Sequence, residues 1–208
     1  MKNPGLDVVE NNAFPNSVVA VATAIPAFIG YTEKADNEGA TLTRKPWRIS
    51  SMMEFVTCFG KECCAKFILA PNTSASTPPT LTWDDTTKFL LYYSLRLFFE
   101  NGGGPCYIVS VGTYKDIVSK DDLSAGIDLL LSEQEPTMVV IPDAVLLPET
   151  DCIALQQASL KHCGLDTRSR IAILDVYNGM RARQDPAGDC VANFRDHLGD
   201  NYLDFGAA

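Results

Sequence analysis

Histidine is scarce in this sequence: its 208 residues include only His162 and His197. The seven cysteines contain no C-x-x-C pair, and their closest group, Cys58 with the adjacent Cys63 and Cys64, has no histidine near it in the sequence. Because a structural zinc ion needs four such ligands, we predict no metal and no cofactor. We predict instead that the cysteines are small buried hydrophobic residues of a protein in a reducing compartment.

Positive charge and long apolar segments are also limited. Seventeen lysines and arginines stand against 26 aspartates and glutamates, which gives a net charge of −9. Such a chain repels phosphate backbones, so a nucleic-acid partner is not expected. The apolar run at residues 17–31 is too short to span a bilayer, and the amino terminus lacks a basic region leading into an apolar one. We interpret the run as a buried strand and expect neither a signal peptide nor direct membrane insertion.

Familiar catalytic motifs are missing as well, since no G-x-S-x-G, H-E-x-x-H or Walker sequence occurs. The glycines at 102–104 follow a predicted helix and precede a predicted strand, whereas phosphate-binding loops follow a strand and open a helix. His162 and Cys163 are neighbours on a predicted helix and point about 100° apart, which prevents a thiolate–imidazole pair. The sequence therefore favours a protein that is not an enzyme.

What the sequence does contain is a regular alternation of strands and helices. Short apolar strands are predicted at residues 18–31, 106–111, 137–141 and 171–176, and helices at 51–60, from 82–85 to 101, and at 122–133, 150–163 and 189–198. This alternation is typical of a parallel sheet covered on both faces. We therefore predict an α/β core domain at residues 17–208, with a mostly parallel sheet and helices on both faces, preceded by an extended arm at residues 1–16.

The sequence also predicts the position of one loop and details of two helices. Residues 71–82 are rich in serine, threonine and proline and are predicted to be a surface loop. Gly164 is expected to end the helix at 150–163. Phe89, Leu90, Tyr93 and Leu97 recur at helical spacing, which predicts that all four lie on the helix that ends at residue 101.

Four polar residues are candidates for a site. Asp143 and Asp175 lie at or just past the carboxyl ends of predicted parallel strands, the edge where open α/β sheets bind ligands. Together they could hold Mg²⁺ for phosphoryl chemistry, or each could simply cap the next turn. Arg181 and Arg183 follow the strand at 171–176 and could clamp an anion or form an exposed salt bridge to another subunit.

Several long blocks of the sequence resemble those of a known family. They are 17–35 (SVVAVATAIPAFIGYTEKA) with 45–51 (KPWRISS), 92–112 (YYSLRLFFENGGGPCYIVSVG), 135–147 (EPTMVVIPDAVLL) and 170–177 (RIAILDVY). In these blocks the chain resembles the N-terminal half of contractile tail sheath proteins. Within this family, the sequence of these blocks is most similar to that of the sheaths of extracellular phage-tail-like injection systems, and then to those of contractile phage tails and bacteriocins.

The resemblance implies a structural subunit that stacks as six-fold rings around an inner tube and contracts to drive the tube through a target membrane. Its implied partners are other sheath subunits, the inner tube protein, and the baseplate and cap proteins. Its implied location is the bacterial cytoplasm during assembly and then a phage tail or phage-tail-like particle. Family sheaths continue beyond the segment that matches the end of this chain, so we expect the core to be incomplete at its C-terminal side.

Terminal arms of family sheaths add strands to a neighbour's sheet, as in β-augmentation. The residues that match the N-terminal arm, and that would lie at the subunit interface, are Gly5, Leu6, Asp7, Val8, Val9 and Glu10. Two functions of other classes remain open on the sequence alone. One is a magnesium-dependent phosphotransfer or hydrolase domain that uses Asp143 and Asp175, and the other is a regulatory or binding module that shares the α/β fold.

Overall fold

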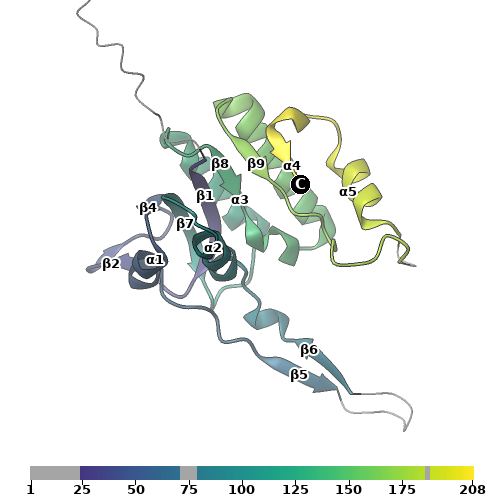
Figure 1. Ribbon diagram of the computed structural model, residues 1–208, viewed down its shortest axis with the longest axis horizontal. Helices are drawn as coiled ribbons and strands as arrows, with labels where there is room; N and C mark the ends of the chain where they lie inside the picture. The colour runs from purple at the N-terminus through teal and green to yellow at the C-terminus, as the bar shows by residue number, and fades with distance from the viewer. Residues whose placement is uncertain (1–23, 71–78, 186–187) are drawn as a thin grey trace, which may run out of the picture.

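The computed structural model describes residues 24–70, 79–185 and 188–208 (Figure 1). The strands are β1 (Pro26–Thr32), β2 (Asp36–Asn37), β3 (Ala40–Thr41), β4 (Trp47–Ile49), β5 (Phe67–Ala70), β6 (Thr80–Trp83), β7 (Cys106–Thr113), β8 (Met138–Val140), β9 (Ile171–Ile173) and β10 (Gly206–Ala207). The α-helices are α1 (Met52–Phe59), α2 (Leu91–Glu100), α3 (Lys120–Leu129), α4 (Glu149–Lys161) and α5 (Cys190–Leu198). Short 3₁₀ turns are η1 (Asp85–Thr87), η2 (Leu130–Ser132), η3 (Pro142–Leu146) and η5 (Leu203–Phe205), and η4 (His162–Thr167) is a π-helical turn.

Six strands form one sheet in the order β10-β9-β8-β1-β7-β4. The strands from β10 to β7 are parallel, and β4 is antiparallel to β7 at the edge. Two small antiparallel hairpins, β2–β3 and β5–β6, lie outside this sheet, and Figure 1 shows β5–β6 extending away from the body. The predicted α/β fold with a mostly parallel sheet is confirmed.

The alternating side chains of the central strand β1 enter two different cores. Ala27, Ile29 and Tyr31 belong to the larger core, which α3, α4 and α5 complete, whereas Phe28 belongs to a smaller core with α1 and α2. Helices therefore cover both faces of the sheet, as predicted. The smaller core with α1 and α2 does not extend over β9. Ile171 and Ile173 of β9, which lie on the face opposite the larger core, are therefore exposed.

The second predicted helix begins later than expected. Asp84 caps the single turn η1, the chain is extended at Lys88, and α2 begins at Leu91. Phe89 and Leu90 therefore lie before the helix, where Phe89 packs into the larger core and Leu90 is half-buried. Leu91 and Leu95 are the buried residues of α2, whereas Tyr93 and Leu97 are exposed.

Two further expectations are corrected. Gly164 does not end its helix: α4 continues into η4, which ends at Arg168 with a left-handed φ of 54°. Gly164 is instead a point of close approach, since a Cβ atom there would lie 2.8 Å from Cβ of Tyr202. The predicted loop at residues 71–82 is also wrong at its end, because Thr80–Trp83 is strand β6; residues 71–78 lie outside the described part of the chain.

The prediction that the cysteines are buried is largely confirmed, whereas the reducing compartment stays a prediction. Five of the seven cysteines are buried, whereas Cys63 is half-buried and Cys64 is exposed. Among the described residues, no helix is both long enough and apolar enough to cross a membrane. The predicted arm at residues 1–16 lies outside the described residues, so the structure neither supports nor opposes it.

Candidate functional site

Asp143 lies in η3, directly after β8, and is completely buried. Its Oδ2 accepts a hydrogen bond from the Tyr31 N–H at 3.1 Å, and its Oδ1 accepts one from the Leu90 N–H at 2.7 Å. The second bond caps the start of α2, whose own N-cap residue makes no side-chain hydrogen bond. Asp143 therefore joins the end of β1 to the start of α2, 53 residues before it in the chain, whereas the alternative left open by the sequence was a cap of the turn that follows Asp143.

The surroundings of Asp143 disfavour its negative charge. Burial raises the pKa of the Asp143 carboxyl to about 6, although the backbone N–H groups around it act in the opposite direction. The carboxylate also fills the space beside Gly30, where a Cβ atom would lie 2.6 Å from Oδ2. A glycine at this position of β1 is what allows the carboxylate to reach the backbone.

Asp175, the second predicted carboxylate, follows β9 and is accessible to solvent. It lines an open cavity of about 670 Å³ beside α2, and Asp143 does not line this cavity. Partial burial raises the pKa of the Asp175 carboxyl. Since Asp143 is enclosed and its oxygens already accept backbone hydrogen bonds, the structure does not bring the two carboxylates to one accessible point. In the described part of the chain, no group of three or more His, Cys, Asp or Glu side chains is placed to hold a metal ion.

The two predicted interface arginines differ in their surroundings. Arg183 Nε and Nη2 lie 2.9 and 2.8 Å from Oδ2 of Asp189, the N-cap residue of α5. The hydrogen bond in this bridge raises the pKa of Arg183 and lowers the pKa of Asp189. Arg181 is exposed on the same turn. Arg183 thus forms a bridge within the chain, and a contact of Arg181 with another molecule stays a prediction.

A buried cation that the sequence did not reveal lies just before β9. Arg170 is 3% exposed, and its guanidinium lies 2.8 Å from Nε2 of His162. It also donates to the backbone carbonyls of Leu130, Glu133 and Pro136. Because Arg170 can only donate, His162 Nε2 accepts, and burial together with the arginine charge lowers the pKa of His162. His162 therefore faces Arg170 and not Cys163, in agreement with the prediction that the neighbouring pair does not interact.

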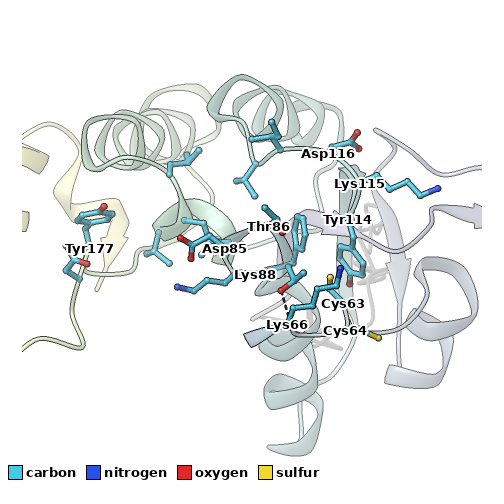
Figure 2. Close-up of a pocket in the computed structure, with 18 residues that line it drawn as sticks. Cys63, Cys64, Lys66, Asp85, Thr86, Lys88, Tyr114, Lys115, Asp116 and Tyr177 are labelled. Carbon is cyan, nitrogen blue, oxygen red and sulfur yellow. Dashed lines mark hydrogen bonds between the residues drawn. The ribbon is translucent and has the colours of Figure 1, made fainter. Parts of the chain in front are cut away.

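A cavity of about 950 Å³ opens at the carboxyl edge of the sheet (Figure 2). Its walls come from the segments after β7, β8 and β9, from the residues around η1 and from the segment just before β5. The chain leaves β1 toward α1 and α2 on one face of the sheet, and leaves β8 toward α4 on the other. In open α/β sheets this change of direction is where ligands bind, so this is the position at which a small-molecule site would be sought.

The polar groups of this cavity do not converge on one point. Figure 2 shows the side chains of Lys66, Lys88 and Lys115 pointing in different directions. Asp116 accepts hydrogen bonds from the Thr113 N–H at 2.7 Å and the Thr113 hydroxyl at 3.0 Å. The position at the sheet edge is thus that of a ligand site, but these side chains give it no specific chemistry.

The sulfur and phenol groups of the same cavity are not activated. Burial raises the pKa of the Cys63 thiol and of the Tyr114 phenol, so both stay protonated at neutral pH. A cysteine nucleophile requires the opposite shift, toward the thiolate. Neither group therefore has the electrostatic setting of a catalytic nucleophile.

Among the described residues, a group of exposed apolar side chains lies together on the β5–β6 hairpin. Phe67, Ile68, Leu69 and Leu81, all in the β5–β6 hairpin, are exposed by more than half of their surface. The sequence signal for this hairpin was present, because the apolar run 67–70 (FILA) and the alternating, β-prone segment 80–83 (TLTW) flank a segment of turn-forming residues. The proline and serine content of the segment between them favoured a loop instead.

Comparison with known proteins adds no assignment. Neither a protein-family model nor a curated protein matches this chain. The candidate arm residues from Gly5 to Glu10 lie outside the described residues, so the structure places none of them. What the structure offers for function is therefore the fold, the cavity at the sheet edge and the exposed apolar hairpin.

Proposed function

We propose that this chain is part of a structural subunit of a contractile tail sheath, which packs with other subunits around an inner tube. The proposal starts from the blocks of resemblance. These blocks contain β9, β8, β1 and all but the last residue of β7, which are four adjacent strands of the sheet, together with most of α2. The resemblance thus involves the centre of the fold and not a peripheral segment.

The observation that supports an assembly role most directly is the apolar surface that the fold leaves uncovered. Leu69 and Leu81 of the hairpin are 63% and 62% exposed, and Ile171 and Ile173 of β9 are exposed on the sheet face. Monomeric proteins rarely expose contiguous apolar patches larger than a few hundred Å². A subunit that packs against further protein would bury such surfaces.

The interior of the fold supports the same proposal for a different reason. A subunit of a contracting sleeve must keep its own fold while its contacts with neighbours change. All seven residues of β1 are buried, the two faces of the sheet carry separate cores, and Asp143 ties β1 to α2. This arrangement suits a rigid unit whose adjustable contacts lie at its surface.

The proposal is tested by locating the chain in particles from the cells that produce it. Phage-tail-like particles would be isolated in the extended and the contracted state, and labelled with gold-conjugated antibodies raised against residues 79–185. We expect labels along the outer sleeve in both states, with more label per unit length in the shorter, contracted sleeve. Labels restricted to the baseplate or the inner tube, or particles that lack the chain, would show that the proposal is wrong.

A further inference from the structure

The β5–β6 hairpin has one fully apolar face. Phe67 pairs with Trp83 and Leu69 pairs with Leu81, whereas the alternate pairs are Ile68 with Thr82 and Ala70 with Thr80. Because paired residues share a face and neighbours along a strand point to opposite faces, the first two pairs form one side of the ribbon. That side consists of Phe67, Leu69, Leu81 and Trp83, and we call it the ribbon face.

The ribbon is anchored at its base. The Thr87 hydroxyl accepts hydrogen bonds from the Lys66 N–H at 3.0 Å and from Nε1 of Trp83 at 3.2 Å, and the Asp84 N–H donates to the Lys66 carbonyl at 2.8 Å. The rings of Phe67 and Trp83 also pack together, with 5.9 Å between their centroids. A two-stranded ribbon is marginally stable in water by itself, so these contacts hold the base of the ribbon while its outer residues remain exposed.

An apolar groove lies beside the ribbon. It is the cavity of about 670 Å³ between α2 and the segment after β9, and its apolar lining includes Tyr93 and Leu97 of α2 and Met180 of the opposite wall. The indole of Trp83 makes an edge contact with the ring of Tyr93, at 6.5 Å between centroids. The ribbon face and the groove are therefore adjoining parts of one surface.

The two parts match in apolar area. Phe67, Leu69 and Leu81 on the ribbon, and Tyr93, Leu97 and Met180 in the groove, have exposed fractions between 36% and 92%. Taken with whole-residue areas of about 200–250 Å², each set exposes roughly 400 Å² of apolar surface. A standard-size interface buries roughly 800 Å² per partner, of which slightly more than half, about 450 Å², is apolar, so each set can supply most of that apolar share.

Charge also favours contact between copies at this place. The chain carries a net charge of −9, which opposes association of its copies in general. The ribbon strands Phe67–Ala70 and Thr80–Trp83 contain no charged residue, and the groove lining contains one lysine, Lys88, and one aspartate, Asp175. Both parts are thus locally neutral, so a contact here avoids the repulsion that other surfaces would meet.

We propose that a second copy of this chain occupies the groove, with the ribbon face of one copy packed against Tyr93, Leu97 and Met180 of the next. Because ribbon and groove are different parts of the chain, the contact is heterologous and leaves a free ribbon at one end and a free groove at the other. It can therefore repeat from copy to copy. The inference names an interface for the assembly proposed above and in that respect rests on the proposed function.

The test uses the full chain in sedimentation velocity over a range of concentrations. Leu81→Glu alters the ribbon and Leu97→Glu alters the groove, while Leu131→Glu changes a comparably exposed leucine of η2 as the control. We expect the unaltered chain and the control to associate equally, and each of the two variants to raise the dissociation constant by ~10-fold or more, because a glutamate would be buried in an apolar contact. All three leucines are exposed, so the melting temperatures should stay close to that of the unaltered chain.

Mixing the two variants sharpens the test. A Leu97→Glu copy keeps its ribbon and a Leu81→Glu copy keeps its groove, so an equimolar mixture should form dimers and nothing larger. The proposal is overturned if the unaltered chain stays monomeric, if either variant associates as the unaltered chain does, or if the mixture stays monomeric. Normal sleeves built from either variant alone would overturn the interface and leave the sheath assignment intact. If the Leu81→Glu and Leu97→Glu variants lose association but the antibodies label no sleeve, the interface is supported and the sheath assignment is overturned.

Discussion

The guanidinium of Arg170 lies 2.8 Å from Nε2 of His162 inside the fold, and both residues are buried. Burial, together with the positive charge of Arg170, keeps this imidazole neutral in the folded chain, whereas in the unfolded chain it takes up a proton near its ordinary pKa of 6.5. Because of this pair, the free energy of unfolding should fall as the pH falls.

As pH falls below about 6.5, the unfolded chain binds a proton at His162 that the folded chain does not bind, so this residue should lower stability in acid. His162→Gln keeps an acceptor for Arg170 but does not titrate. We expect the loss of stability between pH 7 and pH 5 to be smaller in His162→Gln than in the unaltered chain, as measured by urea unfolding at each pH. Equal losses in both proteins would contradict the assignment of a neutral, depressed imidazole.

Asp143 should have the opposite effect on the pH dependence of stability. Its pKa of about 6 in the folded chain exceeds the ordinary value of 3.8, so the folded chain binds the extra proton and gains stability as pH falls through this range. One unit of pKa corresponds to about 1.4 kcal/mol, so the contribution between pH 7 and pH 5 is roughly 1 kcal/mol. Asp143→Asn should lack this contribution. A variant whose stability follows the same pH profile as the unaltered chain would argue against a buried carboxyl that titrates near pH 6.

The same substitution should destabilise the chain at neutral pH. The two oxygens of Asp143 accept from the N–H groups of Tyr31 and Leu90, and an asparagine amide offers only one oxygen for two donors. One backbone N–H is then left unpaired in the core, which costs about 1–3 kcal/mol. Denaturant midpoints at pH 7 measure this difference, and an unchanged midpoint would mean that the carboxylate does not hold α2 to β1.

Gly30→Ala should disturb the same junction from the other side. The added Cβ would lie 2.6 Å from Oδ2 of Asp143 and 3.1 Å from Cβ of Leu91, so the carboxylate must move. Overpacking of this kind costs about 1–3 kcal/mol. The matched control is Gly104→Ala, whose Cβ would meet no atom within 4 Å. Thermal unfolding of both variants checks this, and equal melting temperatures would contradict the close approach at Gly30.

Magnesium should have no effect on stability. Asp143 is enclosed and its oxygens are bound to the backbone, while Asp175 alone offers a cation too few ligands. We expect millimolar Mg²⁺ to leave the melting temperature unchanged, because a ligand that binds the folded state must raise it. A magnesium-dependent rise that Asp175→Asn abolishes would favour the phosphoryl-transfer alternative instead.

The sequence predicted what local patterns determine. Apolar runs and helical spacing located β7, β8, β9 and, apart from the start of α2, the five α-helices of the described residues, and from these the parallel sheet followed. The start of α2 was missed because it depends on Asp143, which lies 53 residues from Leu90 in the chain. The role of Arg170 was missed for the same reason, since the backbone carbonyls that it binds, those of Leu130, Glu133 and Pro136, lie 34 to 40 residues before it in the chain. Contacts between distant segments have no local signature.

The place of β1 in the sheet has a consequence for the growing chain on the ribosome. β1 is synthesised first among the sheet strands, yet both of its neighbours, β7 and β8, are synthesised much later. At about 5–20 residues per second, the ribosome needs roughly 4–16 s to pass from Thr32 to Thr113. During this time the apolar segment Pro26–Thr32 has no strand to pair with, although all of its residues are buried in the finished fold. Nascent chains that end before β7 should therefore be the ones that bind chaperones or aggregate.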